Sequence, residues 1–364
     1  SGTFVNIGGE LRPRVAALSA ATGLATAWDP GADAVVRTLA LQGNDLYMGG
    51  DFLMTNGKKR EGLFAIDRAT SVITPWRADV GSGNTVNTIM KDGTTLYAGG
   101  FFGTFGGVLR NNIAAVDLNT ALVSAWNPGS GGNSILALVK NGNTIYAGGN
   151  FTSIGGQSRS NLGALDATTG LATAFNPAPN FQVSTLALDG TNLYVGGTFT
   201  TILATSRTRA AAIDLNTTTL LSWNPIADSE VRNIAINGPK ALLLGSFFNI
   251  GGPARSRIAS WSTTTGALNA FVPVANNTVR ELKYDAGILY CGGDFNQMSA
   301  VTRNGFAAVN ATTGALTSLN PGSGVVYSIA IDGTSLYAGG QFTSFGGQTR
   351  IRLAEISLIT GLAT

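Results

Sequence analysis

The stretch Leu46-Tyr47-Met48-Gly49-Gly50-Asp51-Phe52 returns along this chain, with small changes, at a nearly constant interval. Residues 96–102 are a second clear copy, whereas the copy ending Leu244-Gly245-Ser246-Phe247 is degenerate. The phenylalanines that close the copies lie 47 to 50 residues apart, at Phe4, Phe52, Phe102, Phe151, Phe199, Phe247, Phe295 and Phe342. A period this regular predicts one supersecondary unit that is repeated along the chain.

One repeat, residues 86–128, has the pattern of four short strands. Alternating apolar and polar residues, β-rich runs and turn residues place these strands at residues 86–90, 95–100, 112–116 and 122–126. Asp92-Gly93 is typical of a hairpin turn, and Gly99-Gly100 predicts a bend or a close approach of the neighbouring backbone. Residues 105–107 are predicted to be a loop, and Asn127-Pro128 ends the fourth strand.

Four antiparallel strands in this length match one blade of a β-propeller. We therefore predict an all-β fold, with residues 1–364 forming a single propeller domain that has an incomplete repeat at each end. Because the chain begins inside a repeat, we also expect a processed or excised chain. The first-strand element occurs seven times and the third-strand element eight times, from residues 15–18 to residues 353–356. Seven blades are favoured, with eight as the alternative.

Seven blades leave one surplus pair of outer strands, from either residues 4–30 or residues 342–364. An unpaired strand edge is a template for pairing with another chain, so one hypothesis is self-association through donated strands. Head-to-tail donation of this kind would build an open filament. The alternative is that the chain belongs to a longer protein whose remainder completes the ring.

The motifs resemble those of the delta-60 repeat family of bacterial β-propellers. The resemblance extends over residues 4–364 and rests on Asp92-Gly93, Gly99-Gly100-Phe101-Phe102, Arg110-Asn111-Asn112-Ile113-Ala114 and Trp126-Asn127-Pro128-Gly129. It implies a propeller in a secreted or surface protein, without an established activity. The chain departs from the family by placing Trp at four of its seven Phe-Asn-Pro aromatic positions, and Leu319 at another.

Composition excludes several classes of function. The net charge of +3 comes without any basic run, so we expect no nucleic-acid partner. The apolar runs have the length of strands, so we expect no membrane span. Cys291 is the only cysteine and the chain has no histidine, so neither a Ser/His/Asp triad nor a Cys/His metal site can form. We expect no cofactor, no metal and no catalytic residue, and we interpret Cys291 as a small buried hydrophobic residue.

An arginine stands eight residues after each closing phenylalanine. The set is Arg12, Arg60, Arg110, Arg159, Arg207, Arg255, Arg303 and Arg350. Equivalent positions in a propeller lie on one circle, so a cationic ring that binds an acidic polysaccharide or a carboxylate-bearing partner is one interpretation. The other is structural, with each guanidinium capping carbonyls of the preceding loop or of a neighbouring blade.

Other recurring residues also allow a structural and a functional interpretation. The aromatics before the Asn-Pro turns are either a sugar-stacking set or packing between blades, and the second is favoured. Asp67, Asp117, Asp166 and Asp214 follow the third strand, where a carboxylate usually caps the turn. Turns such as Thr169-Gly170 are explained by hairpin geometry without a ligand.

These observations predict an extracellular or bacterial cell-surface protein without enzymatic activity. Low charge and an abundance of Thr, Asn and Gly agree with that location. Its expected role is structural or adhesive, through self-assembly or through binding of a protein or a surface polysaccharide. The alternative is a carbohydrate-active propeller enzyme that uses acidic residues in the central channel.

Overall fold

The computed structural model describes residues 31–363 except 68, 69, 71, 253, 254, 272, 323, 333, 334 and 350–352, together with residues 6–7 and 10–11. Short antiparallel strands make up this chain, as the alternating sequence pattern predicts. The chain divides into two compact units, one within residues 27–222 and one within residues 223–364. The second unit also takes β1 (Asn6–Ile7) and β2 (Glu10–Leu11). A single domain over residues 1–364 stays a prediction. Within the described residues, the structure has no apolar helix of membrane-spanning length.

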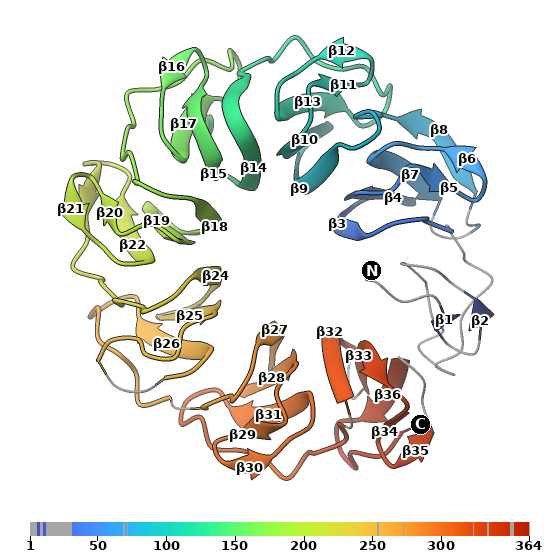
Figure 1. The fold of residues 1–364 in the computed structure, drawn as a ribbon, viewed down its shortest axis with the longest axis vertical. Helices are drawn as coiled ribbons and strands as arrows, with labels where there is room; N and C mark the ends of the chain where they lie inside the picture. The colour runs from blue at the N-terminus through green and yellow to red at the C-terminus, as the bar shows by residue number, and fades with distance from the viewer. Residues whose placement is uncertain are drawn as a thin grey trace. The chain divides into compact units, whose positions relative to one another are not determined.

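The first unit contains four antiparallel sheets, one for each sequence repeat (Figure 1). The first sheet is β3 (Val36–Gln42), β4 (Asp45–Gly50), β7 (Leu63–Asp67) and β8 (Ile73–Arg77). The second is β9 (Thr85–Asp92), β10 (Thr95–Phe101) and β13 (Ile113–Asp117). The third is β14 (Ser130–Asn141), β15 (Thr144–Ile154) and β17 (Leu162–Asp166), with β16 (Gln157–Ser158) on the end of β15. The fourth is β18 (Val183–Asp189), β19 (Asn192–Gly197), β22 (Ala210–Asp214) and β23 (Thr219–Leu220).

The second unit repeats this plan in three further sheets. They are β24 (Val231–Asn237), β25 (Lys240–Gly245) and β26 (Ile258–Ser262); β27 (Val279–Asp285), β28 (Ile288–Gly293) and β31 (Phe306–Asn310); and β32 (Gly324–Asp332), β33 (Ser335–Phe342) and β36 (Leu353–Ser357). Besides two-stranded ribbons, the described residues thus hold seven sheets of three or four strands, one for each first-strand element of the sequence. Because β36 pairs with β33, the last third-strand element, residues 353–356, belongs to the last sheet. On the prediction of seven blades, the surplus outer element is then the segment 4–30, most of which lies outside the described residues.

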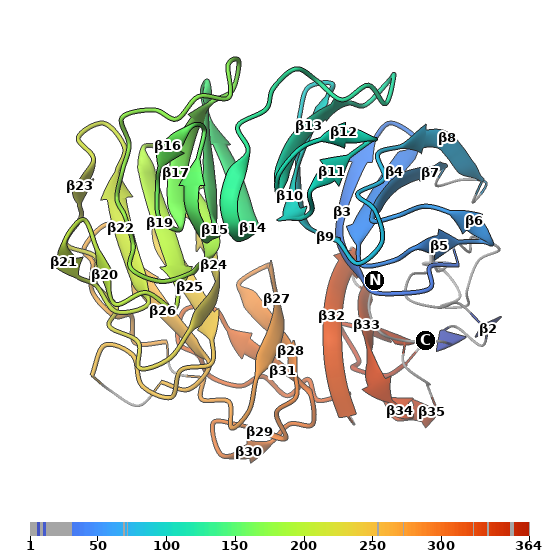
Figure 2. The same cartoon turned by 45° about the horizontal axis from the view of Figure 1, so that its top comes forward.

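First strands of neighbouring sheets lie against each other at four places within the two units. In the first unit β3 lies against β9, β9 against β14, and β14 against β18, with the later strands of each sheet following behind (Figures 1 and 2). In the second unit β27 lies against β32 in the same way. The apolar faces of neighbouring sheets form the cores, so burial accumulates between repeats and not within one repeat.

The paired glycines of the second strand explain this close arrangement. A Cβ atom added at Gly100 would lie 2.0 Å from the carbonyl oxygen of Thr85, and one added at Gly149 would lie 2.1 Å from that of Ser134. The first strand bulges at the same place, where the register shifts between Gly99 and Gly100. The preceding glycine faces the next sheet, since a Cβ atom at Gly99 would lie 2.6 Å from a methyl carbon of Ile135. Of the two predicted alternatives, a bend or a close approach, the close approach of the neighbouring backbone is confirmed.

Two parts of the repeat differ from the prediction. Residues 105–107 are not an irregular loop, because Phe105 ends β11 (Thr104–Phe105) and Gly106-Gly107 form the turn to β12 (Val108–Leu109) in a two-stranded ribbon. Gly106 and Gly107 both have positive φ angles, the requirement of a tight I′ turn. The equivalent ribbons are β5 (Met54–Thr55) and β6 (Lys58–Lys59), β20 (Thr201–Ile202) and β21 (Thr205–Ser206), β29 (Gln297–Met298) and β30 (Val301–Thr302), and β34 (Ser344–Phe345) and β35 (Gln348–Thr349).

The predicted fourth strand over residues 122–126 is reduced to a single bridge between Val116 and Val123. Two backbone hydrogen bonds flank this bridge, from Asp117 to the carbonyl of Leu122 at 3.0 Å and from Ser124 to the carbonyl of Ala115 at 2.9 Å, and Asn127-Pro128 stops pairing soon afterwards. Only β8 and β23 are longer outer strands among the described residues.

Replacing Gly100 with alanine is expected to lower the free energy of unfolding by about 3 kcal/mol or more, because the new Cβ meets backbone atoms that cannot rotate away. Gly103→Ala is the matched control, since a Cβ there has open space, and its effect should stay within about 0.5 kcal/mol. Denaturant unfolding of both variants measures the difference. Equal stabilities would contradict the role assigned to the glycine pair.

Candidate functional site

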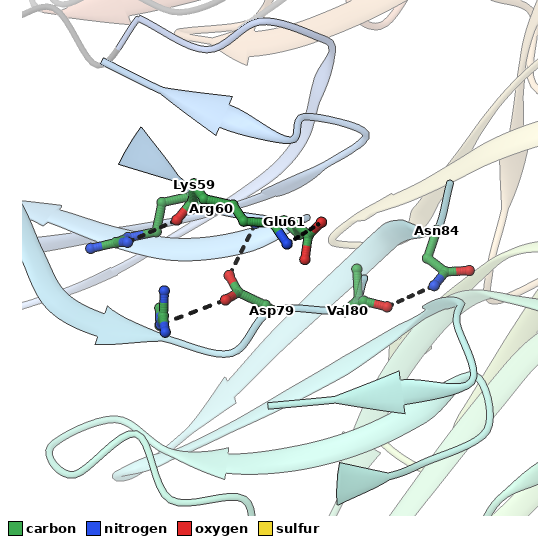
Figure 3. A network of polar contacts seen from close by, with 7 residues as sticks. Lys59, Arg60, Glu61, Asp79, Val80 and Asn84 are labelled. Atoms are coloured by element: carbon green, nitrogen blue, oxygen red, sulfur yellow. Dashed lines mark hydrogen bonds and ion pairs between the residues drawn. The ribbon is translucent and has the colours of Figure 1, made fainter. Parts of the chain in front are cut away.

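The recurring arginines lie between the two-stranded ribbon and the third strand of each sheet. Their side chains fold back onto their own repeat. Nη1 donates to the carbonyl of the preceding residue, as from Arg110 to Leu109 at 2.9 Å and from Arg60 to Lys59 at 2.8 Å (Figure 3). Nη2 donates to the carbonyl fourteen residues later, at the outer edge of the same sheet. These bonds join Arg110 to Ser124 (2.6 Å), Arg159 to Thr173 (2.7 Å), Arg303 to Thr317 (3.0 Å), and Arg60 to Thr74 and Arg207 to Leu221 (3.4 Å each).

Each fork therefore ties the ribbon to the outer edge of its own sheet. The predicted capping of carbonyls is observed, but the acceptors lie in the same repeat and not in a neighbouring one. Burial lowers the pKa of the Arg60 and Arg255 guanidiniums below the ordinary value of arginine, and Arg77 lowers that of Arg60 further. Arg12 and Arg350 lie outside the described residues. Anion binding by this set stays a prediction.

Charged residues around the first ribbon add a second set of ties (Figure 3). The backbone N–H of Glu61 donates to the Asp79 carboxylate at 3.0 Å, and Arg77 lies 3.5 Å from the same carboxylate. Asn84 closes the link to the next sheet by donating to the carbonyl of Val80 at 2.7 Å. This network orders the connection between the first two sheets.

The residue two positions after the recurring arginine is a structural position that sequence reasoning missed. Its φ angle is positive in every described copy, at Gly62, Asn112, Asn161, Arg209, Arg257 and Gly305. Asn112 accepts from the backbone N–H of Phe102 at 3.0 Å and donates to Ser130, so it joins two consecutive repeats. Arg257 instead places its guanidinium 4.1 Å from the ring centre of Phe248. The recurrence of Asn and Gly at this position was the signal available in the sequence.

Carboxylates after the third strand hold the turn that follows. The Asp166 Oδ1 atom accepts from the backbone N–H groups of Thr168 and Thr169 at 2.9 and 2.7 Å. The Asp117 carboxylate accepts from the two equivalent N–H groups of its own turn. Hydrogen bonds from the backbone lower the pKa of both carboxyls below the ordinary value of aspartic acid. The prediction that these residues cap turns is confirmed, and so is the left-handed glycine that closes them, with φ of 77° at Gly170.

The aromatic residues before the Asn-Pro turns pack between repeats, as favoured from the sequence. The Trp76 indole donates to the carbonyl of Asp117 at 3.0 Å, and Trp126 donates to that of Asp166 at 3.0 Å. Each ring also stands edge-on to the tyrosine of its own repeat, with ring centres 4.7 Å apart for Tyr47 and Trp76. Cys291 is fully buried, and burial raises the pKa of its thiol to about 12.

One cleft of the first unit lies where the first sheet meets the turn of the second. It has a volume of about 510 Å³, and its lining includes Gln42, Asp45, Tyr47, Trp76, Asn119 and Thr120. The Tyr47 hydroxyl donates to the carbonyl of Leu118 at 2.9 Å, which fixes the ring within the wall. Burial, together with the negative charges of Asp45 and Asp117, raises the pKa of Tyr47 to about 12. A cleft in the second unit, about 470 Å³, has an aliphatic lining that includes Leu319, Leu358 and Leu362.

Three solved structures resemble this chain over most of its length. The computationally designed Ika8 protein is 14% identical, with a TM-score of 0.61 over 93% of this chain and 87% of its own. BamB from Moraxella catarrhalis is 15% identical, with a TM-score of 0.55 over 92% of this chain and 86% of its own. A chain of the Mitotic Checkpoint Complex is 14% identical, with a TM-score of 0.55 over 81% of this chain and 83% of its own.

The chain is a β-propeller. Its blades are the four-stranded antiparallel sheets predicted from the repeat, with the fourth strand often reduced to a bridge. No protein-family model and no curated protein sequence matches the chain. Likeness at this level of identity shows the fold alone. The resemblance to the delta-60 repeats therefore stays an interpretation of the sequence.

Arg110→Ala is expected to lower the free energy of unfolding by about 1–3 kcal/mol, because it leaves the partly buried carbonyl of Ser124 without its donor. Arg232→Ala is the control, because this exposed arginine only pairs with Glu230, and it should cost less than about 1 kcal/mol. Denaturant unfolding compares the two variants. An Arg110→Ala protein of unchanged stability that no longer binds anionic polysaccharide would instead support the cationic-ring interpretation.

Asp166→Asn is expected to make the protein less sensitive to acid. The pKa of Asp166 is lower in the folded state than in the unfolded state. The ionised carboxylate therefore stabilises the folded state above the ordinary aspartate pKa, and this stabilisation is lost as the pH falls through the folded-state pKa. Asparagine keeps the acceptor without titrating, as Asn310 does at 2.9 Å in the sixth blade.

Thermal unfolding between about pH 5 and pH 2 tests this prediction. The reciprocal change, Asn310→Asp, should increase the acid sensitivity of the sixth blade. If both variants follow the same pH profile as the unchanged protein, the carboxylate does not act through these hydrogen bonds.

Proposed function

We propose that this propeller is a non-enzymatic extracellular module that works by binding a partner, either a protein or a surface polysaccharide. The proposal rests on one observation: the recurring polar residues form hydrogen bonds with the propeller's own backbone. The Arg forks, the Asp turns and the aromatic N–H groups bind backbone carbonyls or N–H groups of the same propeller. Ligand contacts are then left to residues that do not recur, such as those in the cleft of the first unit.

Two acidic residues that directly follow second strands support a binding role over hydrolysis. Asp51 forms a two-point ion pair with Arg37, at 2.7 and 2.8 Å, and Asp294 forms the same pair with Arg280, at 2.7 and 2.6 Å. Hydrolysis of a glycosidic bond needs two carboxyl groups on opposite sides of the substrate, one of them protonated. In each of these pairs both carboxylate oxygens already accept from a guanidinium, so neither carboxylate is free to contact a substrate. The carbohydrate-active enzyme is therefore the weaker alternative.

Composition and fold together support an extracellular location and a role as a scaffold that binds a partner. Few charges and abundant Thr, Asn and Gly are usual in surface repeat proteins, and the delta-60 resemblance points the same way. A chain of similar fold is found within the Mitotic Checkpoint Complex, so a propeller can work as part of an assembly. Self-assembly of the present chain is a second form of the proposal. It rests on the repeat count, which leaves residues 4–30 as the surplus outer element once β36 is paired with β33.

The purified chain should bind at least one extracellular polymer and leave it intact. The measurement combines a glycan array and a pull-down from envelope extracts with an assay of new reducing ends on the same polysaccharides. Binding without new reducing ends supports the proposal. New reducing ends that appear with time would overturn it in favour of the enzyme, and particles that grow with chain concentration in light scattering would favour self-assembly.

A further inference from the structure

One face of the first sheet carries leucines that are open to solvent over its innermost strand. Leu41, Leu46 and Ile66 are paired neighbours across β3, β4 and β7, and their exposure falls from 51% at Leu41 to 0% at Ile66. In the adjacent row, Leu39 is 43% exposed, whereas Met48 beside it is fully buried. The outer part of this face is therefore covered, and the part over β3 is open.

The fourth sheet holds leucines at the equivalent positions, and there they are covered. These residues are Leu186, Leu188 and Leu193, in the register of Leu39, Leu41 and Leu46. Leu193 is fully buried and Leu186 is 8% exposed. In two further sheets, Ile234 and Ile329 at the position of Leu39 are 4% and 3% exposed. Each of these sheets thus has a cover at the place where the first sheet is open.

An inner hairpin, formed by the first and second strands of the preceding repeat, covers the leucines of the fourth sheet. Its first strand, β14, lies against β18. Val139 and Tyr146 are opposite each other in the hairpin of β14 and β15, and with Ala137 they pack in one core with the three leucines. The tyrosine and the two smaller side chains are therefore the surface that fits this leucine face.

The exposed leucines do not have the character of a solvent-facing end. A terminal repeat in a stack needs a polar outer face to stay soluble. Leu39, Leu41 and Leu46 instead keep the residue type of a covered interface, and they adjoin the covered residues Met48 and Ile66 on the same face. Continuity with that covered part places an occupant over β3, at the position that an inner hairpin takes on the fourth sheet.

From this comparison we infer that the face of β3 and β4 formed by Leu39, Leu41 and Leu46 is a docking surface for an inner β-hairpin of this same repeat, carried by a separate peptide segment. The hairpin lies face-on against the leucines, with its tyrosine and small apolar side chains toward them. The inference goes beyond the proposed function, since it names a surface and a polypeptide partner that polysaccharide binding does not require.

The test titrates the whole chain with a synthetic peptide of residues 135–149, which spans the hairpin of β14 and β15. Because an isolated hairpin is only marginally stable in water, a linker joins its two ends, and NMR confirms the hairpin before use. We expect saturable binding by calorimetry, and a thermal midpoint of the chain that rises with peptide concentration. A peptide with Tyr146→Ser should bind at least tenfold more weakly.

A chain with both Leu39→Thr and Leu41→Thr loses most of the apolar face and should bind the peptide at least tenfold more weakly. Threonine favours strands and both leucines are exposed, so the thermal midpoint without peptide should stay unchanged. The matched control carries Leu122→Thr and Leu171→Thr, since these leucines are 69% and 63% exposed beyond the turns that follow β13 and β17. It should bind as the unchanged chain does.

Failure of the peptide to bind overturns the docking surface, and so does equal binding by the Leu39 and Leu41 variant and by the control. If the unchanged chain forms dimers in sedimentation without peptide and the variant stays monomeric, the face is a contact between copies, and the hairpin is overturned as its occupant. If the hairpin binds while no extracellular polymer does, the docking surface stands and polysaccharide binding fails.

Discussion

The close approach of backbone at the paired glycines is the constraint on which the rest of this propeller depends. At the second glycine of each pair, the carbonyl of the first strand lies where any side chain would be, and the first strand bulges to make that contact. At the first glycine, a valine or isoleucine of the next blade fills the space instead. One dipeptide therefore sets both the curvature within a blade and the packing between blades, which is why it recurs with the period of the fold.

The other recurring residues follow from the same need to hold short strands together. A blade with four brief strands has few ladder hydrogen bonds, and its outermost strand is often a single bridge. The arginine forks replace part of that missing pairing by joining the ribbon to the outer edge, and the aspartates hold the turn between the last two strands. Regular recurrence thus goes with structural use at these positions.

Much of the fold can be predicted from the sequence because the signals are local and repeated. The alternation of apolar and polar residues predicts the first three strands, Asp92-Gly93 predicts the hairpin, and the glycine pair predicts close backbone contact. The ribbon at Thr104–Leu109 was missed because two-residue strands carry no period, and the fourth strand was overestimated because apolar residues persist there after the pairing has ended. The candidate cleft could not be foreseen, since Tyr47 and Asn119 are brought together only by the packing of one blade on the next.

The degenerate fifth repeat shows how far the constraint can be relaxed. Leu244 takes the place of the first glycine, and it is buried in the same core as Val279 of the following blade. In four other blades, at Gly49, Gly99, Gly148 and Gly292, a Cβ atom at this position would lie under 3 Å from the valine or isoleucine of the next blade, so a leucine needs more room between its sheets. The second glycine, Gly245, is retained, with its Cβ position 2.0 Å from the carbonyl of Glu230. Packing between blades can therefore adapt to a large side chain, whereas the backbone contact within a blade cannot.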